Sequence, residues 1–372
     1  MMLKENLFWL NYTILVLIAF IGFIMPNLLK ENILFGSRFP NEIIHHPDVK
    51  DLKKNYRHIY ITVFIPFLVI LGYFLNNSSS EIYLSLGIIV EVLLVFLIYA
   101  IYNLKAKELK KDLLTVENVH TQKKILTVDT GFSTGKYLIS IWWFLPSLII
   151  IIANVFVLVL FYNKIPDQIV LHIDFQGTPD LLVVKSYLHV LLMPITSFFI
   201  LCIFVGVYFS IKLSKRELDS NRPETSKLKD KHFRLIWSDY SVIICTLLVA
   251  WMLFVSLHLN GLFEIPADIF KYFNLGLPFL ILLSTIVLAI KTGQSGSKLK
   301  LNINESETGL NNVDDDSFWK FGMIYYNPQD PSIMVQKRFG VGWTLNFGRP
   351  ASLVILIALI VFIVLINILT KK

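Results

Sequence analysis

The chain has 372 residues, of which 55% are hydrophobic and only 16% are charged, and its mean hydropathy is +0.63. Soluble domains carry about a quarter charged residues, so this composition excludes an ordinary soluble domain and indicates an integral membrane protein. The two cysteines, Cys202 and Cys245, lie inside apolar runs, which argues against a disulfide framework.

Eight apolar runs are long enough to cross a bilayer as helices, which takes about 20 residues each. They lie at 7–25, 59–75, 82–102, 138–162, 186–210, 236–258, 273–290 and 350–369. Strands of a β-barrel would be about 10 residues long and would alternate in polarity, whereas these runs are continuous. The sequence therefore predicts an all-α polytopic membrane protein with about eight transmembrane helices.

Lysine and arginine show which loops face the cytoplasm. Most of the 34 Lys and Arg residues fall in four segments between the spans, at 26–58, 103–137, 211–235 and 291–349. Positive loops stay on the cytoplasmic side, so both termini are expected on the outer side of the membrane. The net charge of +7 is then explained by topology and by attraction to the lipid bilayer. Because no basic face on a folded module is visible, we expect no direct nucleic-acid partner.

In chain order, the sequence divides into six regions. They are an N-terminal three-span region with cytoplasmic loops (1–137), a two-span unit with an extracytoplasmic loop at 163–185 (138–210), two further spans (211–290), a flexible linker (291–315), an aromatic-rich cytoplasmic module (316–350), and the last span with the C-terminus (351–372). The linker is predicted from its Gly, Ser, Asn and acidic residues, which are typical of disordered chain.

Four polar side chains are expected at membrane depth, and they are Glu91, Asn154, His189 and Asp239. An ionisable group there costs about 2.5–3.5 kcal/mol on insertion scales. Glu91, in the middle of its span, is the most informative of them. It would either line a proton or cation route, or stay neutral and hydrogen-bond inside the helix bundle.

The loop Pro166–Asp180 is the best-structured candidate on the outer side. Residues 168–175 alternate weakly and predict an extended segment, and residues 176–180 predict a turn. The candidate ligand-binding residues are His172, Asp174, Gly177 and Asp180. They would either face a ligand or satisfy backbone groups of a rigid cap. The pattern lacks paired histidines and cysteines, so we expect no metal site.

The module at 316–350 is rich in aromatic residues around a strong turn signal, Asn327–Pro331. The flanking stretches 323–326 and 332–337 predict two strands of one hairpin. Its candidate binding residues are Tyr325, Tyr326, Asn327, Asp330, Arg338 and Trp343. The module would be either a docking surface in the cytoplasm or an aromatic plug at the membrane interface, where Trp and Tyr are favoured.

The outer loop carries the pattern P-x-x-I-x-x-H-x(4)-G-x-P-D between two spans. With this pattern the chain resembles the SdpI-like family of bacterial membrane proteins, in which a domain of unknown function links two spans. The stretches YYNPQDP and KRFGVGWTLNFGRP resemble a second, C-terminal domain of unknown function. The resemblance implies immunity to a secreted toxic peptide, with an extracellular antimicrobial peptide and a cytoplasmic transcriptional regulator as partners. The chain departs from the immunity protein by three extra spans at the front and a large cytoplasmic insertion near the end.

Two functions therefore stay open at the level of sequence. The first is peptide-toxin immunity or envelope-stress sensing and signalling, without enzymatic activity. The second is a transporter or channel that uses Glu91 and proline-kinked helices, although no internal repeat in register is visible. An intramembrane enzyme ranks below both, because the H-E-x-x-H and G-x-S-x-G signatures are missing and no cofactor is expected.

Overall fold

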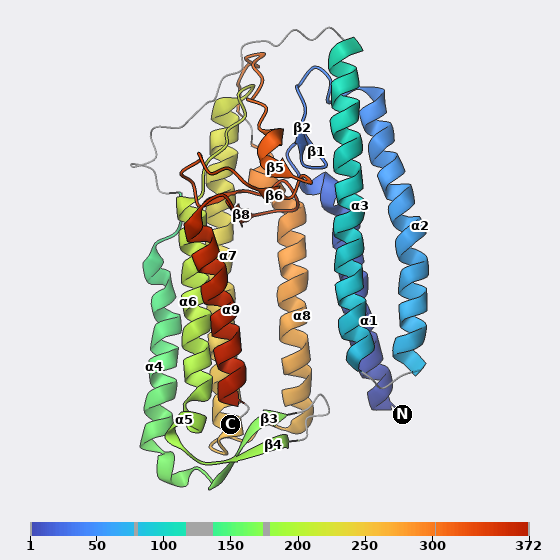
Figure 1. Ribbon diagram of the computed structural model, residues 1–372. Helices are drawn as coiled ribbons and strands as arrows, with labels where there is room; N and C mark the ends of the chain where they lie inside the picture. The colour runs from blue at the N-terminus through green and yellow to red at the C-terminus, as the bar shows by residue number, and fades with distance from the viewer. Residues whose placement is uncertain (1, 78–80, 117–136, 174–178, 302, 371–372) are drawn as a thin grey trace. The chain divides into compact units, whose positions relative to one another are not determined.

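The computed structural model describes residues 2–77, 81–116, 137–173, 179–301 and 303–370, and most of them are helical (Figure 1). The α-helices are α1 (Met2–Leu28), α2 (Pro47–Asn77), α3 (Glu81–Val116), α4 (Leu145–Leu160), α5 (Tyr187–Val190), α6 (Leu192–Leu213), α7 (Pro223–Leu259), α8 (Ala267–Thr292) and α9 (Pro350–Thr370). Single 3-10 turns are η1 (Ile141–Phe144), η2 (Tyr162–Lys164), η3 (Gln294–Gly296) and η4 (Asp316–Phe318).

Among the described residues, six helices are long and apolar enough to cross a membrane, which confirms a multi-pass helical membrane protein. They cover Pro47–Asn77, Ile82–Val116, Ile141–Leu160, Leu192–Leu213, Pro223–Leu259 and Tyr272–Gly296. The other two predicted spans lie in α1, where Tyr12–Leu28 forms a shorter apolar helix, and in α9. The number of eight spans and the outside termini therefore stay predictions.

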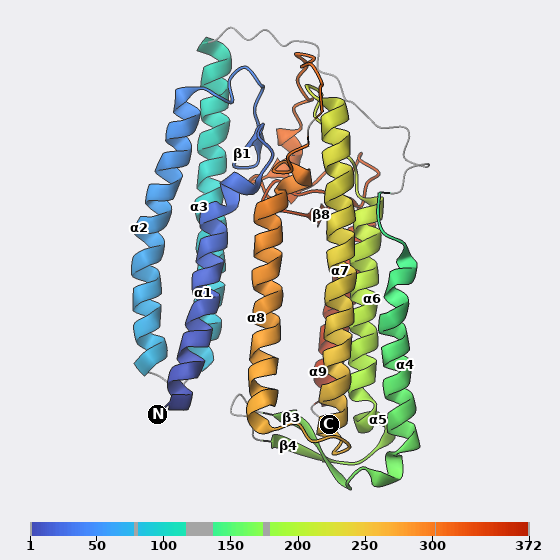
Figure 2. The ribbon, with the colours of Figure 1, turned by 180° about the vertical axis from the view of Figure 1, so that it is seen from behind.

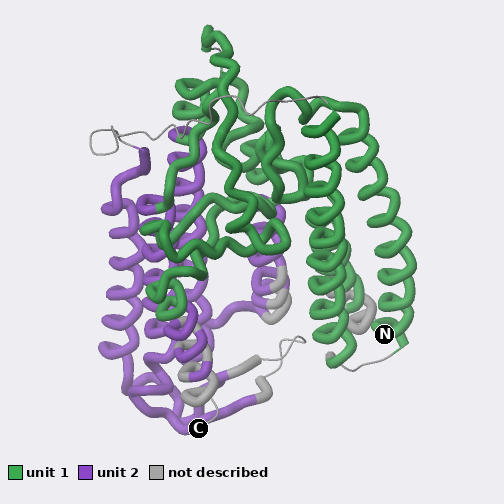
Figure 3. The backbone as a smooth tube through the Cα atoms, turned by 45° about the horizontal axis from the view of Figure 1, so that its top comes forward, with its two compact units in different colours: residues 1–133, 214–230, 286–355 green, residues 134–213, 231–285, 356–372 purple. Residues whose placement is uncertain are grey.

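The chain forms two compact units (Figure 3). Unit 1 holds residues 1–133, 214–230 and 286–355, and unit 2 holds residues 134–213, 231–285 and 356–372. The units thus cross the linear division expected from sequence, because the aromatic module shares a unit with the N-terminal helices.

In unit 1, helices α1, α2 and α3 lie side by side (Figures 1 and 2). Their core is aromatic: Phe35 lies against the rings of Tyr56, Tyr99 and Tyr102 at centroid distances of 5.0–5.8 Å. Phe339 packs on Tyr99 at 4.6 Å. Such pairs add to ordinary apolar burial, so the loop after α1 and a segment near the other end of the chain share one core with the helices.

In unit 2, helices α4 and α6 pack together around a core that includes Phe144, Leu201 and Tyr208. The chain segment that connects these two helices contains an antiparallel hairpin of β3 (Gln168–Ile173) and β4 (Pro179–Val184). Ile169 of this hairpin is buried against Leu158 of α4. The extended segment predicted from residue 168 is confirmed as far as Ile173. The predicted turn is corrected at Pro179 and Asp180, which belong to β4.

Unit 1 also contains three two-stranded sheets. They are formed by β1 (Ile33–Leu34) with β2 (Ser37–Arg38), β5 (Trp319–Lys320) with β6 (Ile324–Tyr325), and β7 (Met334–Gln336) with β8 (Trp343–Leu345). The two strands predicted in the module are present, but the single hairpin predicted from them is wrong. Each pairs with a different strand, because the turn between them is held by the Asn346 side chain, whose amide donates to the carbonyls of Asn327, Asp330 and Ser332 at 2.9–3.2 Å.

The segment predicted as a flexible linker has little regular structure, yet its side chains are anchored within unit 1. The Glu305 carboxylate accepts the backbone N–H groups of Glu224 and Thr225 at the start of α7, at 2.9 and 2.8 Å. This arrangement supplies the missing partners of a helix N-terminus and, despite some burial, lowers the pKa of Glu305. Thr308 and Asn311 bond to residues 220 and 42 respectively.

Candidate functional site

Two Phe-Gly turns meet backbone to backbone in unit 1. Phe35 and Gly36 join β1 to β2 with φ of 46° and 79°, the left-handed pair that a two-residue hairpin requires. Phe321 and Gly322 adopt φ of 53° and 71° in the loop between β5 and β6. A Cβ on Gly36 would lie 2.3 Å from the Gly322 carbonyl oxygen, and a Cβ on Gly322 would lie 2.6 Å from that of Phe35. Only glycine fits at both positions.

Next to these turns lies a cluster of charges, which we call the charge clamp. It consists of three consecutive acids and three cations from distant parts of the chain: Asp314, Asp315, Asp316, Arg38, Lys110 and Arg338. Lys110 Nζ lies 2.6 Å from Asp314 Oδ2 and 2.8 Å from Asp316 Oδ2. Both guanidinium groups contact Asp315, and Arg338 Nη1 donates to Asp316 Oδ1 at 2.7 Å.

The three cations of the clamp are buried, whereas Asp314 is exposed, and the opposite charges compensate each other. Arg38 is 6% exposed and Arg338 is 2% exposed. Burial alone would raise the pKa of Asp315. The guanidinium groups of Arg338 and Arg38 nevertheless hold this pKa below its usual range. Burial and the neighbouring Arg338 lower the pKa of Arg38 to about 10. Arg338 also stacks over the Trp319 ring, 5.0 Å from its centroid. Removing one partner would leave a buried charge uncompensated.

Helix α3 is bound to this region at three levels. The Tyr99 hydroxyl donates to the Arg338 carbonyl at 2.7 Å, and the Asn103 amide donates to the Phe35 carbonyl at 2.7 Å. Lys110, further along the same face, enters the clamp. These residues follow each other after four and seven positions, and this spacing places them along one side of the helix. One apolar helix therefore carries the N-terminal loop, the acidic triad and the aromatic module together.

A second acid organises the turn of the module. Asp330 is 7% exposed, and its Oδ2 accepts the Tyr325 hydroxyl at 2.9 Å and lies 2.7 Å from Lys215 Nζ. Burial alone would raise the pKa of Asp330, but the hydrogen bond from Lys215 lowers this pKa. Asn327 donates its side-chain amide to the Tyr325 hydroxyl at 3.3 Å. The structure thus brings three of the predicted module residues into one network.

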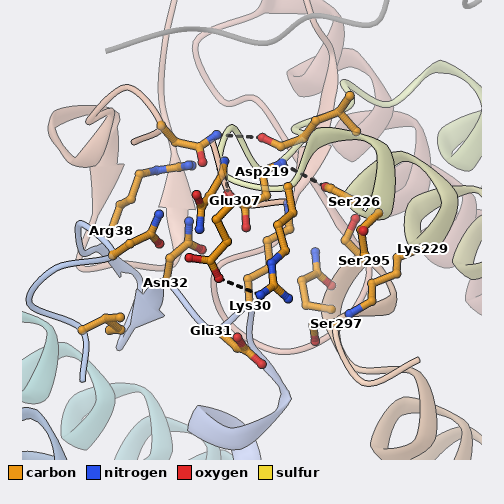
Figure 4. A pocket seen from close by; sticks show the side chains of 18 of the residues that line it. Lys30, Glu31, Asn32, Arg38, Asp219, Ser226, Lys229, Ser295, Ser297 and Glu307 are labelled. Atoms are coloured by element: carbon orange, nitrogen blue, oxygen red, sulfur yellow. Dashed lines mark hydrogen bonds and ion pairs between the residues drawn. The ribbon is translucent and has the colours of Figure 1, made fainter. Parts of the chain in front are cut away.

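Unit 1 also contains a partly open polar cavity of about 430 Å³ (Figure 4). Three stretches supply its walls: the residues after α1, those at the start of α7, and those after α8. The walls carry four cations, Lys30, Arg38, Arg222 and Lys229, and three acids, Glu31, Asp219 and Glu307. Most other lining residues have amide or hydroxyl side chains. A pocket with so few apolar groups suits a small charged ligand rather than an apolar one.

Two of the outer-loop candidates lie in the β3–β4 hairpin. His172 lies in β3, where its Cα partner is Leu181, and Asp180 lies in β4. Asp174 and Gly177 lie outside the described residues. The hairpin backbone is therefore established here, whereas a ligand site on it remains a prediction.

The four residues predicted at membrane depth have different surroundings. Glu91 and Asn154 are buried at 0% and 1% exposure, and neither carboxylate oxygen of Glu91 nor Oδ1 of Asn154 has a hydrogen-bond partner among the described residues. His189 is half-buried, with Nδ1 2.9 Å from the Val184 carbonyl oxygen. Asp239 is exposed. Glu91 belongs to unit 1, and the other three residues belong to unit 2.

Of the remaining module candidates, Tyr326 is 48% exposed, while Trp343 lies in β8. Sequence reasoning missed Arg38, Lys110 and the acidic triad. A signal was present, since the dipeptide Phe-Gly recurs at 35–36, 321–322, 339–340 and 347–348. Repeated aromatic–glycine pairs indicate tight turns with an anchored ring. Among the residues that the structure describes, no group of three His, Cys, Asp or Glu side chains could hold a metal ion.

Comparison with protein families gives two partial matches. A domain described as "Domain of unknown function (DUF1648)", which is typical of membrane proteins, matches residues 148–198, from α4 through the hairpin into α6. A family described as "Family of unknown function (DUF5808)" matches residues 328–353, from the Asp330 turn into α9. The comparisons with curated proteins and with solved structures gave no match.

Proposed function

We propose that this integral membrane protein is a non-enzymatic sensor or immunity protein of the bacterial cell membrane, of the SdpI-like type. In this proposal eight helices span the membrane and both termini lie outside. The β3–β4 hairpin recognises an extracellular antimicrobial peptide or a related envelope stress. The module at 316–350 passes the state of the protein to a cytoplasmic transcriptional regulator.

One observation supports this proposal above the others. Helix α3, a candidate membrane span, is bonded to the module through Tyr99 and to the acidic triad through Lys110. A shift or rotation of this helix would act on the Arg338 backbone and on the acidic triad together. Membrane signalling proteins need such a mechanical link between a span and a cytoplasmic surface.

The first test is growth of a deletion strain against a panel of secreted antimicrobial peptides. We expect deletion to sensitise cells to at least one peptide and a His172→Ala variant to fail to restore growth. Gln168→Ala, an exposed residue of the same strand, serves as the control and should restore it. Equal protection by both variants would refute recognition at the hairpin, provided that immunoblots show equal protein levels.

A second function is favoured by one specific observation, the buried and unbonded carboxyl group of Glu91. Such a group inside a membrane helix marks proton or cation routes in transporters. In proteoliposomes, a transporter would lose proton or cation flux in Glu91→Gln and keep it in Asp239→Asn, which changes an exposed acid. Equal flux in both variants would rule this function out.

A further inference from the structure

The cavity of unit 1 is lined by two lysines that form no ion pair with the described residues. Lys229 lines the cavity, and its ammonium group makes no hydrogen bond or ion pair with any residue that the structure describes. Lys30 donates to the Glu217 carbonyl at 2.8 Å, which uses one of its three N–H donors. By contrast, Arg222 is paired with Glu307 at 2.6 Å, and Arg38 belongs to the charge clamp.

Hydroxyl groups on the same walls add further donors. The Ser226 hydroxyl oxygen accepts the Asp219 N–H at 2.9 Å, which leaves its own proton free to donate. Ser297 donates to the Leu29 carbonyl over a long 3.4 Å. Figure 4 shows both serines and both lysines among the side chains that surround the opening. Ammonium and hydroxyl donors from three stretches of chain are the groups that bind phosphate oxygens.

Four cations face three acids on the walls, so the acids offset this charge only in part. Glu307 is paired with Arg222, while Asp219 Oδ1 accepts the Asn221 N–H at 3.0 Å and keeps its negative charge. Only exposed Glu31 remains without such a partner among the described residues. Burial and the neighbouring Arg38 lower the pKa of Lys30 to about 8, because the ammonium group is desolvated and lies near another cation. A bound anion would offset both effects.

We propose that this cavity binds a phosphate monoester through Lys30 and Lys229. A volume of about 430 Å³ exceeds one phosphate ion, so the ligand carries a further polar group. Two sources share this chemistry, a soluble phosphate monoester and the headgroup of phosphatidate. Part of the wall, Gln294–Ser297, lies at the end of a candidate span, where lipid headgroups are found. This site does not depend on the sensing function proposed above.

The test uses the full-length protein in two arms. In nanodiscs of phosphatidylcholine alone, calorimetric titration with sn-glycerol 3-phosphate measures the soluble source. In nanodiscs with rising fractions of phosphatidate, native mass spectrometry counts the phosphatidate molecules that the protein retains. Both arms compare the wild type with Lys30→Gln, Lys229→Gln and Lys231→Gln, the last of which lies on the same helix but does not line the cavity.

We expect saturable binding in at least one arm, and that arm identifies the source. Lys30→Gln and Lys229→Gln should each weaken it about tenfold or more, because each removes charge-assisted hydrogen bonds, and Lys231→Gln should leave it unchanged. No saturable binding in either arm, or equal affinity in the wild type and Lys229→Gln, would overturn the proposal. If Lys30→Gln does not fold, Lys229→Gln decides, with thermal unfolding as the check on its structure.

Discussion

Helix α3 carries buried polar side chains in two contrasting environments. In the charge clamp, Lys110 is 7% exposed and meets two carboxylates within 2.8 Å. On the same helix, Glu91 is fully buried, and neither of its oxygens is bonded among the described residues. Lys110 therefore follows the rule that buried charges are paired, and Glu91 does not.

This contrast separates structural from functional candidates. The charge clamp has a structural role, since its opposite charges pair with each other and connect distant segments of the chain. The Glu91 carboxyl group makes no hydrogen bond to the described residues, and an acid at membrane depth is costly. We infer that substitutions in the clamp act mainly on stability, whereas those at Glu91 act mainly on activity. The predictions below test this division.

The largest effect is expected at Arg338. Arg338→Gln removes a buried cation from two carboxylates and from the Trp319 ring. We expect a loss of about 3–5 kcal/mol in the free energy of unfolding, measured by chemical denaturation in mixed micelles. The control is Arg222→Gln, which breaks an exposed pair and should cost less than about 1 kcal/mol. Similar losses for both would show that the clamp does not stabilise unit 1.

The facing turns should be nearly as sensitive. Gly36→Ala forces a side chain into a left-handed backbone, 2.3 Å from the Gly322 carbonyl oxygen. We expect a loss on the order of 3 kcal/mol, seen as a lower thermal unfolding temperature or reduced yield. Gly206→Ala is the matched control, because no atom lies within 4 Å of the added methyl group. Unfolding at the wild-type temperature in Gly36→Ala would contradict the close approach of the two turns.

A smaller effect concerns pH. Burial and the positive charge of Arg38 lower the pKa of Lys30 to about 8. Arg338 lowers it further, while Asp230 and Asp219 oppose the shift. Between pH 8 and about 10.5 the unfolded chain binds more protons at this residue than the folded chain. Stability should therefore rise with pH across this window. Thermal unfolding at pH 7, 8, 9 and 10 should show the rise in the wild type and a weaker one in Lys30→Met.

Next in size is a pair of tyrosines on α3. Tyr99→Phe removes a hydroxyl that donates to the Arg338 carbonyl, so we expect a loss of about 1 kcal/mol in unfolding free energy. Tyr102 is equally buried, but its hydroxyl has no partner among the described residues. Tyr102→Phe should therefore be neutral or slightly stabilising. A larger loss at Tyr102 than at Tyr99 would reverse this account of the helix.

The smallest effect on stability is expected at Glu91. Glu91→Gln keeps the shape of a neutral carboxyl group and breaks no hydrogen bond found among the described residues. We expect a change below about 0.5 kcal/mol in the same denaturation assay. A loss above about 1 kcal/mol would show that Glu91 is ionised and paired, and it would then belong with the charge clamp rather than apart from it.

The helices were predictable because their signal is local. An apolar run of about 20 residues must form its hydrogen bonds internally, whatever its neighbours do. For this reason each predicted span coincides with a helix, including those in α1 and α9. The short strands around Tyr325 and Val335 were also predictable from a local signal, because residues that favour strands flank a proline turn.

The pairing of distant segments was not predictable. The composition of 291–315 suggests a solvated linker, and nothing local reveals that Asp315 meets Arg38 and Arg338. The register of the module depended on Asn346, whose amide replaces the strand partner that the single predicted hairpin would have needed. Such contacts depend on the folded arrangement of several elements, and a single sequence does not contain that information.

The contact of Gly36 with Gly322 also limits how this protein can be divided for experiments. A peptide covering only residues 316–350 would lack Arg38, Lys110 and the turn that covers Gly322. Its Asp316 and Arg338 would then be solvated and free to bind other charged molecules. An interaction screen with that peptide as bait would report partners of exposed charges rather than partners of the protein. A faithful bait retains the N-terminal loop and α3 as well.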